Sequence, residues 1–343
     1  MSKIVGFPHK PPKLGGPGSF QVRLTDELLK HGYRVVYPED KVWPDVVVVV
    51  AGTSKLAWLY RCIRHGTRVV HRLDGLKWRH KKFSTSLWNR LREDFRNQIM
   101  KFIRNNLCDE VVYQSRFVED WWTDIYGSAK SPSRVIYNGV DLNEFHPRPN
   151  VSNGAPLVLC TEARIENDVV TQSVIRYLAS RLIPKGVIRG IRLVGEIAEA
   201  DQKVLASIDG VELHGSVPRQ MMPDILREGD VLLNLDINAA CPNSVIEALA
   251  SGLPVVGYKT GALEELVPAN AGFLVEYGSD PWQIEKPDLA SLESALVTVV
   301  ADLSVFRVGA RSAAEMRYSL PNMADQYIKV LLEEDVVKRR SSV

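Results

Sequence analysis

Residues 236–266 read DINAACPNSVIEALASGLPVVGYKTGALEEL, and this stretch decides the fold. The run DVLLNLD that ends at Asp236 is short and apolar, as expected of a buried strand, and LPVVGY at 253–258 is a second such run. Between them lie a loop and a segment that predicts a helix beginning near Pro242-Asn243-Ser244. A strand, a helix and a second strand in this order predict a βαβ unit of a parallel sheet.

The same alternation of strands and helices continues along the whole chain. Six strand-like runs extend from KIVGF to RVIYNG in the first part, and six more extend from LVLCTE to GFLVE in the second. Two successive sets predict two doubly wound α/β domains, each with a parallel sheet. The stretch NEFHPRPNVSNGAPL (143–157) is rich in Pro, Gly, Asn and Ser, so we expect the join between the domains there.

The composition is that of a soluble globular protein. The chain has 343 residues, of which 45% are hydrophobic and 24% are charged, and no apolar run approaches the ~20 residues that span a bilayer. The first residues, MSKIVGF, enter a strand directly, so no secretory signal is expected. The four cysteines are scattered and form no C-x-x-C motif, which favours a reduced, cytoplasmic protein.

Charge is distributed unevenly along the chain. The formal net charge is only +2, but residues 1–150 hold 25 Lys and Arg against 15 Asp and Glu, whereas the remainder holds 18 against 26. A basic first half suits an anionic membrane, a phosphorylated substrate or a nucleic acid. No RNA- or DNA-binding motif accompanies the charge, so we expect no nucleic-acid partner.

The helix that begins near Pro242 has two features that suit a ligand. The backbone N–H groups of its first turn, at Asn243, Ser244 and Val245, favour an anion such as a diphosphate. One turn further in, the carboxylate of Glu247 suits the two vicinal hydroxyls of a ribose. However, Ser244–Glu247 also matches the capping box S-x-x-E, in which Glu247 would only cap its own helix.

The wider sequence context resembles the donor-binding signature of glycosyltransferase family 4. The matching residues are Glu247-Ala248-Leu249-Ala250 and Gly252-Leu253-Pro254-Val255-Val256, followed by Gly261 and Glu265-Leu266-Val267. The stretch SRVIYNGVDLNEFHP (133–147) and the pair Gly15-Gly16 also match. The resemblance implies the α/β GT-B fold, in which two Rossmann-like domains face each other across a cleft. It also implies transfer of a sugar from a nucleoside-diphosphate sugar, with retention at the anomeric carbon.

The resemblance assigns roles to parts of the chain. It implies an acceptor-side domain at 1–148, a donor-binding domain at 149–318, and a last segment at 319–343 whose helix packs back toward the first domain. Glu247 is expected to bind the nucleotide ribose. The diphosphate is expected to lie against the Gly15-Gly16 loop, Arg164, and the N-terminus of the helix at Asn243, Ser244 and Val245.

The sequence departs from the family pattern at two positions. The family carries a pair of glutamates, E-x7-E, and the first of them is replaced here by Ala239. That glutamate contacts the donor sugar in the family. The family also places an arginine and then a lysine against the diphosphate. Arg164 matches the arginine, but Val169 replaces the lysine. An ion pair of Arg164 with Glu162 or Glu166 is the alternative to phosphate binding.

RVVHRLDGLKW (68–78) is the candidate acceptor-side stretch of the first domain. Family members have a histidine at this strand end, near the reacting sugar, and Asp74 takes that place here. Alternation along a strand places His71 and Arg72 on opposite faces, so one of them is expected to be packing. We assign Arg72 and Asp74 to the catalytic site. The alternative is that Asp74 caps the next turn or pairs with Arg72 inside the fold.

Residues 77–106 combine positive charge with apolar residues at helical spacing. The stripe of Leu87, Leu91, Phe95, Ile99 and Phe102 is expected to face the core. The preceding basic cluster contains Lys77, Arg79, His80, Lys81 and Lys82. It suits an anionic lipid or an acceptor phosphate, and a solvated loop is the alternative.

Together with these features, the resemblance implies a retaining, metal-independent hexosyltransferase. We expect no cofactor other than the nucleoside-diphosphate sugar, linked to UDP or GDP, and no metal, because the histidines lack zinc-ligand spacing. The expected acceptor is a carbohydrate or a lipid-linked saccharide, with peripheral contact to the cytoplasmic membrane face through the basic half. The alternatives are a non-catalytic GT-B subunit that binds nucleotide sugars, and a nucleotide-sugar epimerase or phosphorylase of the same fold.

Overall fold

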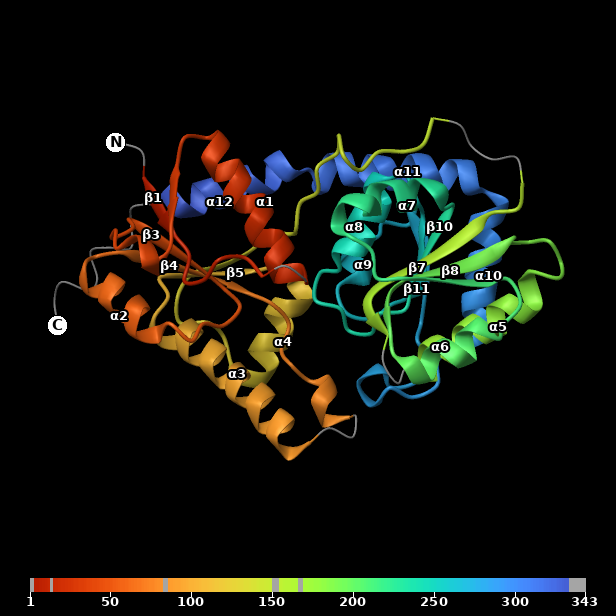
Figure 1. The fold of residues 1–343 in the computed structure, drawn as a ribbon, viewed down its shortest axis with the longest axis horizontal. Coiled ribbons are helices and arrows are strands. Elements are labelled where there is room, and N and C mark those ends of the chain that lie inside the picture. Colours follow the sequence, from red (N-terminus) through yellow and green to blue (C-terminus); the bar gives the residue numbers. More distant parts are fainter. Residues whose placement is uncertain (1–2, 13–14, 83–85, 150–153, 166–168, 333–343) are drawn as a thin grey trace. The chain divides into compact units, whose positions relative to one another are not determined.

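A computed structural model describes residues 3–12, 15–82, 86–149, 154–165 and 169–332. The chain divides into two compact units, each of which is described by itself. Unit 1 comprises Met1–Gly139 and Leu320–Val343, and unit 2 comprises Val140–Ser319. Each unit has a six-stranded parallel sheet with helices on both of its faces (Figure 1). The prediction of two doubly wound α/β domains is therefore confirmed.

The sheet of unit 1 has the strand order β2-β1-β3-β4-β5-β6. Its strands are β1 (Ile4–Gly6), β2 (Arg34–Val36), β3 (Val46–Val50), β4 (Arg68–Leu73), β5 (Glu110–Tyr113) and β6 (Ser133–Val135). Its helices are α1 (Gly16–Lys30), α2 (Leu56–Arg64), α3 (Leu87–Asn106), α4 (Arg116–Tyr126) and α12 (Leu320–Leu332), with 3-10 turns η1 (Pro38–Asp40) and η2 (Arg79–Lys81). The five consecutive valines of β3 are compatible with this fold because helices cover both faces of a parallel sheet.

The sheet of unit 2 has the strand order β12-β11-β10-β7-β8-β9. Its strands are β7 (Leu157–Ile165), β8 (Gly190–Ile197), β9 (Val211–Gly215), β10 (Val231–Asn234), β11 (Val255–Tyr258) and β12 (Gly272–Val275). Its helices are α5 (Val169–Leu182), α6 (Glu199–Ala206), α7 (Met222–Glu228), α8 (Asn243–Ala250), α9 (Leu263–Leu266), α10 (Leu289–Ala301) and α11 (Leu303–Arg317), with 3-10 turns η3 (Arg219–Met221) and η4 (Pro281–Gln283).

The last described helix, α12, is part of the core of unit 1. Met323, Tyr327 and Val330 are buried in the same apolar cluster as residues of α1, β1 and β3. The rings of Phe20 on α1 and Tyr327 on α12 lie with their centroids 5.1 Å apart, and the two helices run side by side in Figure 1. The chain therefore leaves unit 1 after Gly139 and returns to it at Leu320.

Residues 140–148 group with unit 2, whereas the family resemblance implied a first domain that extends to residue 148. The guanidinium of Arg311 on α11 explains this grouping. It donates hydrogen bonds to the carbonyl oxygens of Phe145 at 2.9 Å and of Ala250 at 2.7 Å. Val140 also forms a parallel β-bridge with Ser319. The boundary therefore lies at Gly139 and Val140 because side chains of unit 2 hold the segment that follows.

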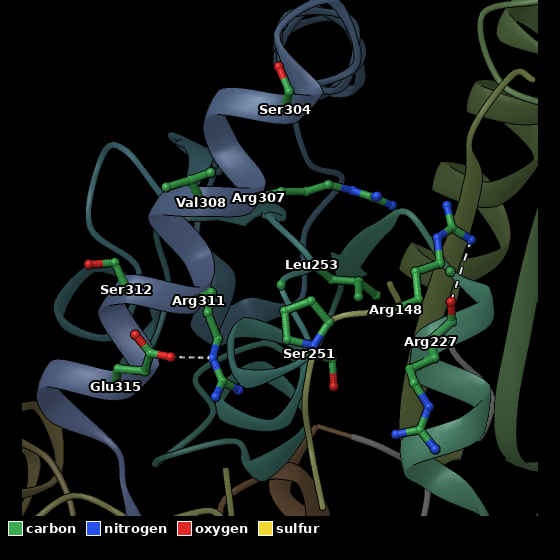
Figure 2. A pocket seen from close by; sticks show the side chains of 13 residues that line it. Arg148, Arg227, Ser251, Leu253, Ser304, Arg307, Val308, Arg311, Ser312 and Glu315 are labelled. Atoms are coloured by element: carbon green, nitrogen blue, oxygen red, sulfur yellow. Dashed lines mark hydrogen bonds and ion pairs between the residues drawn. The ribbon is translucent and has the colours of Figure 1, made fainter. Parts of the chain in front are cut away.

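An arginine-lined pocket of about 430 Å³ lies in unit 2 beside this segment (Figure 2). The buried carboxylate of Asp230 accepts hydrogen bonds from both Arg148 and Arg307, and Glu315 pairs with Arg311. Gly229 and Leu253 also line the pocket, and they precede β10 and β11. The pocket is therefore at the amino ends of these strands. Its arginines bind carboxylates and backbone carbonyls of unit 2, and they hold the segment that follows Gly139 in place.

Helix α3 departs from the prediction that its apolar stripe faces the core. Leu87, Leu91, Phe95 and Phe102 are exposed, with relative accessibilities from 47% to 70%. The buried residues of the helix are Asn97, Met100, Ile103 and Arg104, which lie on its other side. Helical spacing therefore identified an apolar face correctly, but the prediction that this face is buried in the core is wrong.

Within the described ranges, no single helix is both long and apolar enough to cross a membrane. One pair of helices, α10 and α11, has sufficient length and apolar composition when taken together, but the pair is bent by 93°.

Burial of His71 predicts a pH dependence of stability. His71 is fully buried, its Nε2 lies 2.6 Å from the carbonyl oxygen of Ala51, and burial lowers its pKa from 6.5 to about 4. Between these values the unfolded chain binds a proton that the folded chain does not, so stability falls as the pH falls. From about pH 7 to about pH 5 we expect a loss of about 2 kcal/mol from this group. Urea unfolding of the wild type and of His71→Gln measures the difference, because the other titrating groups are common to both. Equal pH slopes for the two proteins would contradict the assignment.

Candidate active site

The candidate site in unit 2 lies where β10 ends and α8 begins. The two elements are joined by residues 235–242, and β10 lies inside the sheet between β7 and β11. Helix α8 begins at Asn243, close to the start expected from the sequence. Asn243 and Ser244 are half-buried, and helix geometry leaves the N–H groups of a first turn without acceptors inside the helix. This end of α8 therefore has the partial positive charge that suits an anion.

The start of α8 excludes the capping-box interpretation of Glu247. The N-cap residue is Pro242, which has no N–H group to donate and no side chain that can accept. Ser244 is at the second helical position, so it does not cap the helix, and Glu247 is too far along the helix to act as the box glutamate. Glu247 is nevertheless 8% exposed, in a helix whose following residues are fully buried. Its carboxylate therefore has another role.

Arg219 is an ionic partner of Glu247. A terminal nitrogen of Arg219, in η3, lies 3.7 Å from Oε1 of Glu247. The Arg219 side chain is 36% exposed and that of Glu247 is 11% exposed. At 3.7 Å the two groups attract each other as ions but are too far apart for a hydrogen bond. The carboxylate can therefore still accept a hydrogen bond from a ligand hydroxyl. The sequence did not indicate Arg219, because it belongs to a separate turn before α7.

Val245 is a correction to the expected set of N–H donors. Its backbone N–H donates to the carbonyl oxygen of Pro242 at 3.2 Å, and its side chain is fully buried. Ile246 also donates to Pro242, at 3.5 Å. A tightened first turn therefore uses the Val245 N–H inside the helix, and the candidate anion donors of this end are Asn243 and Ser244.

The loop before α8 is held in shape by the residues that follow β11. A Cβ atom on Gly261 would lie 2.5 Å from both the backbone N and the O of Ala239, so only glycine allows this approach. Ala262 donates its N–H to the Ala239 carbonyl at 2.9 Å, and Thr260 Oγ1 accepts from the Asn238 N–H at 3.4 Å. Asn238 has a φ of 55°, which is uncommon outside glycine but tolerated by asparagine. Gly261 thus fixes the backbone at the position where the family has its first glutamate.

Three polar side chains, at the middle of β7, at the carboxyl end of β10 and in the loop after β10, were not assigned from the sequence. They are Thr161, Asn234 and Asn238, which are 5%, 3% and 5% exposed. Thr161 Oγ1, both amide atoms of Asn234 and Nδ2 of Asn238 have no hydrogen-bond partner among the described residues. Buried polar atoms without partners are uncommon in folded proteins, and they suit a site that receives a polar ligand. The sequence contained one signal for this group, because Asn234 is a polar residue at the end of the apolar run that forms β10.

Arg164 and Val169 are the two residues expected on the phosphate side of the site. Arg164 lies in the last part of β7, where its backbone pairs with Glu196 on β8 after a bulge that begins at Thr161. Val169 begins α5. The side chains of both residues lie outside the described residues, so the expected contact of Arg164 with phosphate stays a prediction.

Unit 1 contributes the Gly15-Gly16 turn at the start of α1. Gly15 is the N-cap residue, with a φ of 93°, and Gly16 is the first residue of the helix. Both glycines are exposed, and no side chain caps this helix end among the described residues. The positive φ of Gly15 requires glycine, and Gly16 offers an exposed N–H group, whereas Pro17 at the second helical position has none. The expected contact of this turn with the diphosphate stays a prediction.

Arg72 is a buried positioning residue, which corrects its assignment to the catalytic site. Only 1% of it is exposed, and its guanidinium lies 4.0 Å from the centroid of the Phe20 ring. It forms an ion pair with Asp74 and donates to Gln114 Oε1 at 2.6 Å and Asn138 Oδ1 at 2.9 Å. These partners follow β4, β5 and β6, so Arg72 ties three strand ends together. A substrate cannot reach a guanidinium so enclosed.

Asp74 therefore pairs with Arg72 inside the fold, which was the alternative to a catalytic role. Its side chain nevertheless remains 17% exposed. The indole of Trp122 on α4 also donates to the Asp74 backbone carbonyl at 2.9 Å. His71, expected to be packing if Arg72 was not, is fully buried as well. Both neighbouring side chains are thus internal, and Asp74 is the member of this group that reaches the surface.

Within the described part of the chain, no group of three or more His, Cys, Asp or Glu side chains is arranged to hold a metal ion. The expected independence of metal therefore stays a prediction.

Both halves of the chain match known families of glycosyltransferases. Residues 4–144 match the family described as Glycosyltransferase Family 4, and residues 166–297 match the family described as Glycosyl transferases group 1. A putative colanic acid biosynthesis glycosyltransferase, WcaL of Escherichia coli K12, is 29% identical over 162 residues. Those residues are 43% of this chain and 39% of WcaL. The chain spans half or less of the length of the curated relatives it matches.

Solved structures agree in fold over almost the entire chain. Sucrose-phosphate synthase from Thermosynechococcus elongatus superposes with a TM-score of 0.75 at 17% identity, covering 96% of this chain and 98% of its own. HepE of Anabaena, in complex with UDP-glucose, gives a TM-score of 0.70 at 18% identity, covering 96% and 99%. Together with the two parallel sheets, these likenesses show the GT-B fold predicted from the sequence.

The approach of Gly261 to Ala239 predicts a specific sensitivity to substitution. Gly261→Ala combines a φ of 60° with a clash against backbone atoms that cannot move away. Gly186→Ala is the matched control, because Gly186 has a φ of 68° and nothing within 4 Å of its Cβ position. We expect the control to lose about 1–2 kcal/mol of stability and Gly261→Ala to lose clearly more. Urea unfolding checks the difference, and equal losses would show that the close approach is unimportant.

Proposed function

Because the chain belongs to glycosyltransferase family 4, we propose that it is a glycosyltransferase that moves a hexose from a nucleoside-diphosphate sugar to a hydroxyl acceptor. The nucleotide we propose is UDP or GDP, and UDP has the support of HepE, which has been solved with UDP and with UDP-glucose. The proposed acceptor is a carbohydrate or a lipid-linked saccharide. The reaction we propose retains the configuration at the anomeric carbon and needs no metal.

One observation carries the proposal: Glu247 does not cap its own helix. Pro242 occupies the N-cap position, and the carboxylate is buried beside an uncapped helix start. Burying a carboxylate is costly unless it is paired or hydrogen-bonded, and Arg219 provides one ionic partner at 3.7 Å. Two ribose hydroxyls are donors that match an acceptor-only carboxylate. We therefore assign Glu247 to the ribose, and the N–H groups of Asn243 and Ser244 to the diphosphate.

The donor sugar is assigned to the loop that carries Ala239. An alanine offers no side-chain hydrogen bond, so the contact made by the first family glutamate must come from another group. Asn238 is adjacent, and its buried Nδ2 has no hydrogen-bond partner among the described residues. An amide donates where a carboxylate only accepts, so the sugar group it contacts would be an acceptor oxygen. Asn238 is accordingly the residue we propose for recognition of the sugar.

Catalysis in this proposal rests on stabilising the leaving diphosphate. Positive groups placed in advance around a developing negative charge are usually the largest catalytic contribution. The N-terminus of α8, the Gly15-Gly16 turn and Arg164 are the groups we assign to that task. Attack by the acceptor hydroxyl on the face that the diphosphate leaves requires no protein nucleophile. Arg72 keeps the strand ends of unit 1 in place, and Asp74 presents the exposed edge of its carboxylate toward an acceptor.

Substitution of Glu247 tests the ribose assignment. Glu247→Gln retains the size of the side chain but replaces one acceptor oxygen by a donor, so we expect donor affinity to fall roughly 10- to 150-fold. Titration calorimetry with UDP-, GDP-, ADP- and CDP-sugars, after a thermal-shift screen for the nucleotide that stabilises the protein, measures this. Glu212→Gln on β9 is the control, because that carboxylate is 61% exposed and pairs only at the surface.

The same experiment separates the alternatives. If Glu247→Gln lowers the melting temperature but leaves donor affinity intact, the carboxylate serves only to hold η3 through Arg219, and the site is wrong. Tight nucleotide binding without transfer or donor hydrolysis over a broad acceptor panel would identify a non-catalytic subunit instead. Release of the nucleoside diphosphate from one donor, lost in Glu247→Gln, supports the transferase.

A further inference from the structure

Helix α3 carries an apolar face that the fold leaves uncovered. Trp88 is 81% exposed, Leu87 70%, Phe95 64%, Leu91 53% and Phe102 47%. At 3.6 residues per turn, these five side chains fall within about a third of the helix circumference. A soluble protein seldom exposes so many large apolar side chains in one contiguous group unless they bind something.

The opposite side of α3 attaches the helix to unit 1. Met100 and Ile103 are buried there, and Asn97 exchanges two hydrogen bonds with the backbone of Lys77, at 3.0 and 2.9 Å. His80 Nε2 lies 3.1 Å from the carboxylate of Asp94. These contacts hold the loop after β4 against the helix. The apolar face is therefore presented outward by a fixed helix and does not result from a detached one.

Basic side chains surround this face. Residues 77–104 hold nine Lys and Arg against two acidic residues, Glu93 and Asp94. Both acidic groups are already used, Glu93 by Arg92 and Arg96, and Asp94 by His80 and Lys81. On the helix, Arg92 lies beside one edge of the apolar face, and Arg90 and Lys101 lie beside the other. The charge is therefore complementary to a negative surface.

We propose that α3 is a membrane-docking helix that lies in the interface of an anionic phospholipid bilayer. Its apolar face would enter the boundary between headgroups and acyl chains, while Arg90, Arg92 and Lys101 contact lipid phosphates. An amphipathic helix with Trp, Leu and Phe on one side and basic residues beside them is typical of interfacial binding. A second protein of neutral or basic surface would not account for the excess of positive charge. The proposal does not depend on the donor site, because it uses no residue of unit 2.

The position of α3 in the chain gives the docking a consequence for the reaction, which rests on the proposed function. The loop from Asp74 to Lys82 joins the carboxyl end of β4 to η2 and then α3. Asn97 binds this loop directly, and Trp122 binds the carbonyl of Asp74. A bilayer that contacts α3 is thus separated from the carboxyl end of β4 only by the loop that α3 itself binds. A lipid-linked saccharide is the acceptor class that this arrangement favours.

Vesicle binding by the full chain tests the proposal. The probes are vesicles of phosphatidylcholine alone and of phosphatidylcholine mixed with phosphatidylglycerol. We expect sedimentation with the anionic vesicles, weakening with added salt, and little with the neutral ones. Leu91→Glu with Phe95→Glu should lower the partition coefficient at least about a hundredfold. Arg90→Glu with Arg92→Glu, which reverses two of the charges beside the apolar face, should lower it at least about tenfold.

Two controls separate docking from general effects. Val305→Glu with Met316→Glu on α11 replaces apolar residues that are 64% and 69% exposed, and it should leave vesicle binding unchanged. Trp88→Phe should preserve binding but remove the largest blue shift of tryptophan emission, since Trp88 is the reporter on the docking face. Equal melting temperatures confirm that the α3 variants remain folded.

The outcomes are distinct from those of the donor-site experiment. Failure of the wild type to bind anionic vesicles, or equal binding by Leu91→Glu with Phe95→Glu, overturns the docking proposal and leaves Glu247 untouched. A wild-type dimer that Leu91→Glu with Phe95→Glu converts to a monomer, without vesicle binding, would show that a second copy covers this face. Loss of donor binding in Glu247→Gln with normal vesicle binding would support both proposals independently.

Discussion

Burial of both faces of a parallel sheet restricts where this protein can perform chemistry. The inner strands β3, β10 and β11 are apolar almost throughout, because helices cover each sheet on both sides. Polar side chains are tolerated mainly at the strand ends, where loops and helix termini provide partners or leave room for a ligand. Asn234 marks such an end in unit 2, and Arg72 with Gln114 and Asn138 marks them in unit 1.

The two units use their strand ends differently. In unit 1, Arg72 is surrounded by an aromatic ring, a carboxylate and two amides. The atoms without a hydrogen-bond partner there, Arg72 Nε and His71 Nδ1, belong to side chains that are at most 1% exposed. In unit 2 several polar atoms at the equivalent edge have no partner among the described residues, and the adjacent helix start is uncapped. A closed polar cluster stabilises a fold, whereas an open one favours a ligand. This contrast favours a donor site on unit 2.

Elements that depend on local pattern could be predicted from the sequence, and elements that depend on distant contacts could not. Six strands in each unit, the start of α8 and the glycine turn before α1 follow from apolar runs, turn residues and glycine pairs. The capping box failed because a motif of four residues does not specify where the first hydrogen-bonded turn begins. The boundary at Gly139 depends on Arg311, which is far along the chain, and the pairing of Glu247 with Arg219 depends on a separate turn. No local pattern contains either contact.

The apolar stripe of α3 shows why periodicity alone does not determine burial. A helical repeat establishes that one side of a helix is apolar, but the partner that covers it lies outside the repeat. In α3 a second, shorter stripe formed by Asn97, Met100 and Ile103 faces the sheet, and it contains a polar residue that a search for apolar spacing passes over. The excess of positive charge in the first 150 residues favoured a different partner, because an anionic surface is attracted to basic residues beside an apolar face. Charge and periodicity are both explained if the apolar face meets a surface that is both apolar and anionic. A phospholipid interface has both properties, and that is the physical basis for assigning the face of α3 to a membrane.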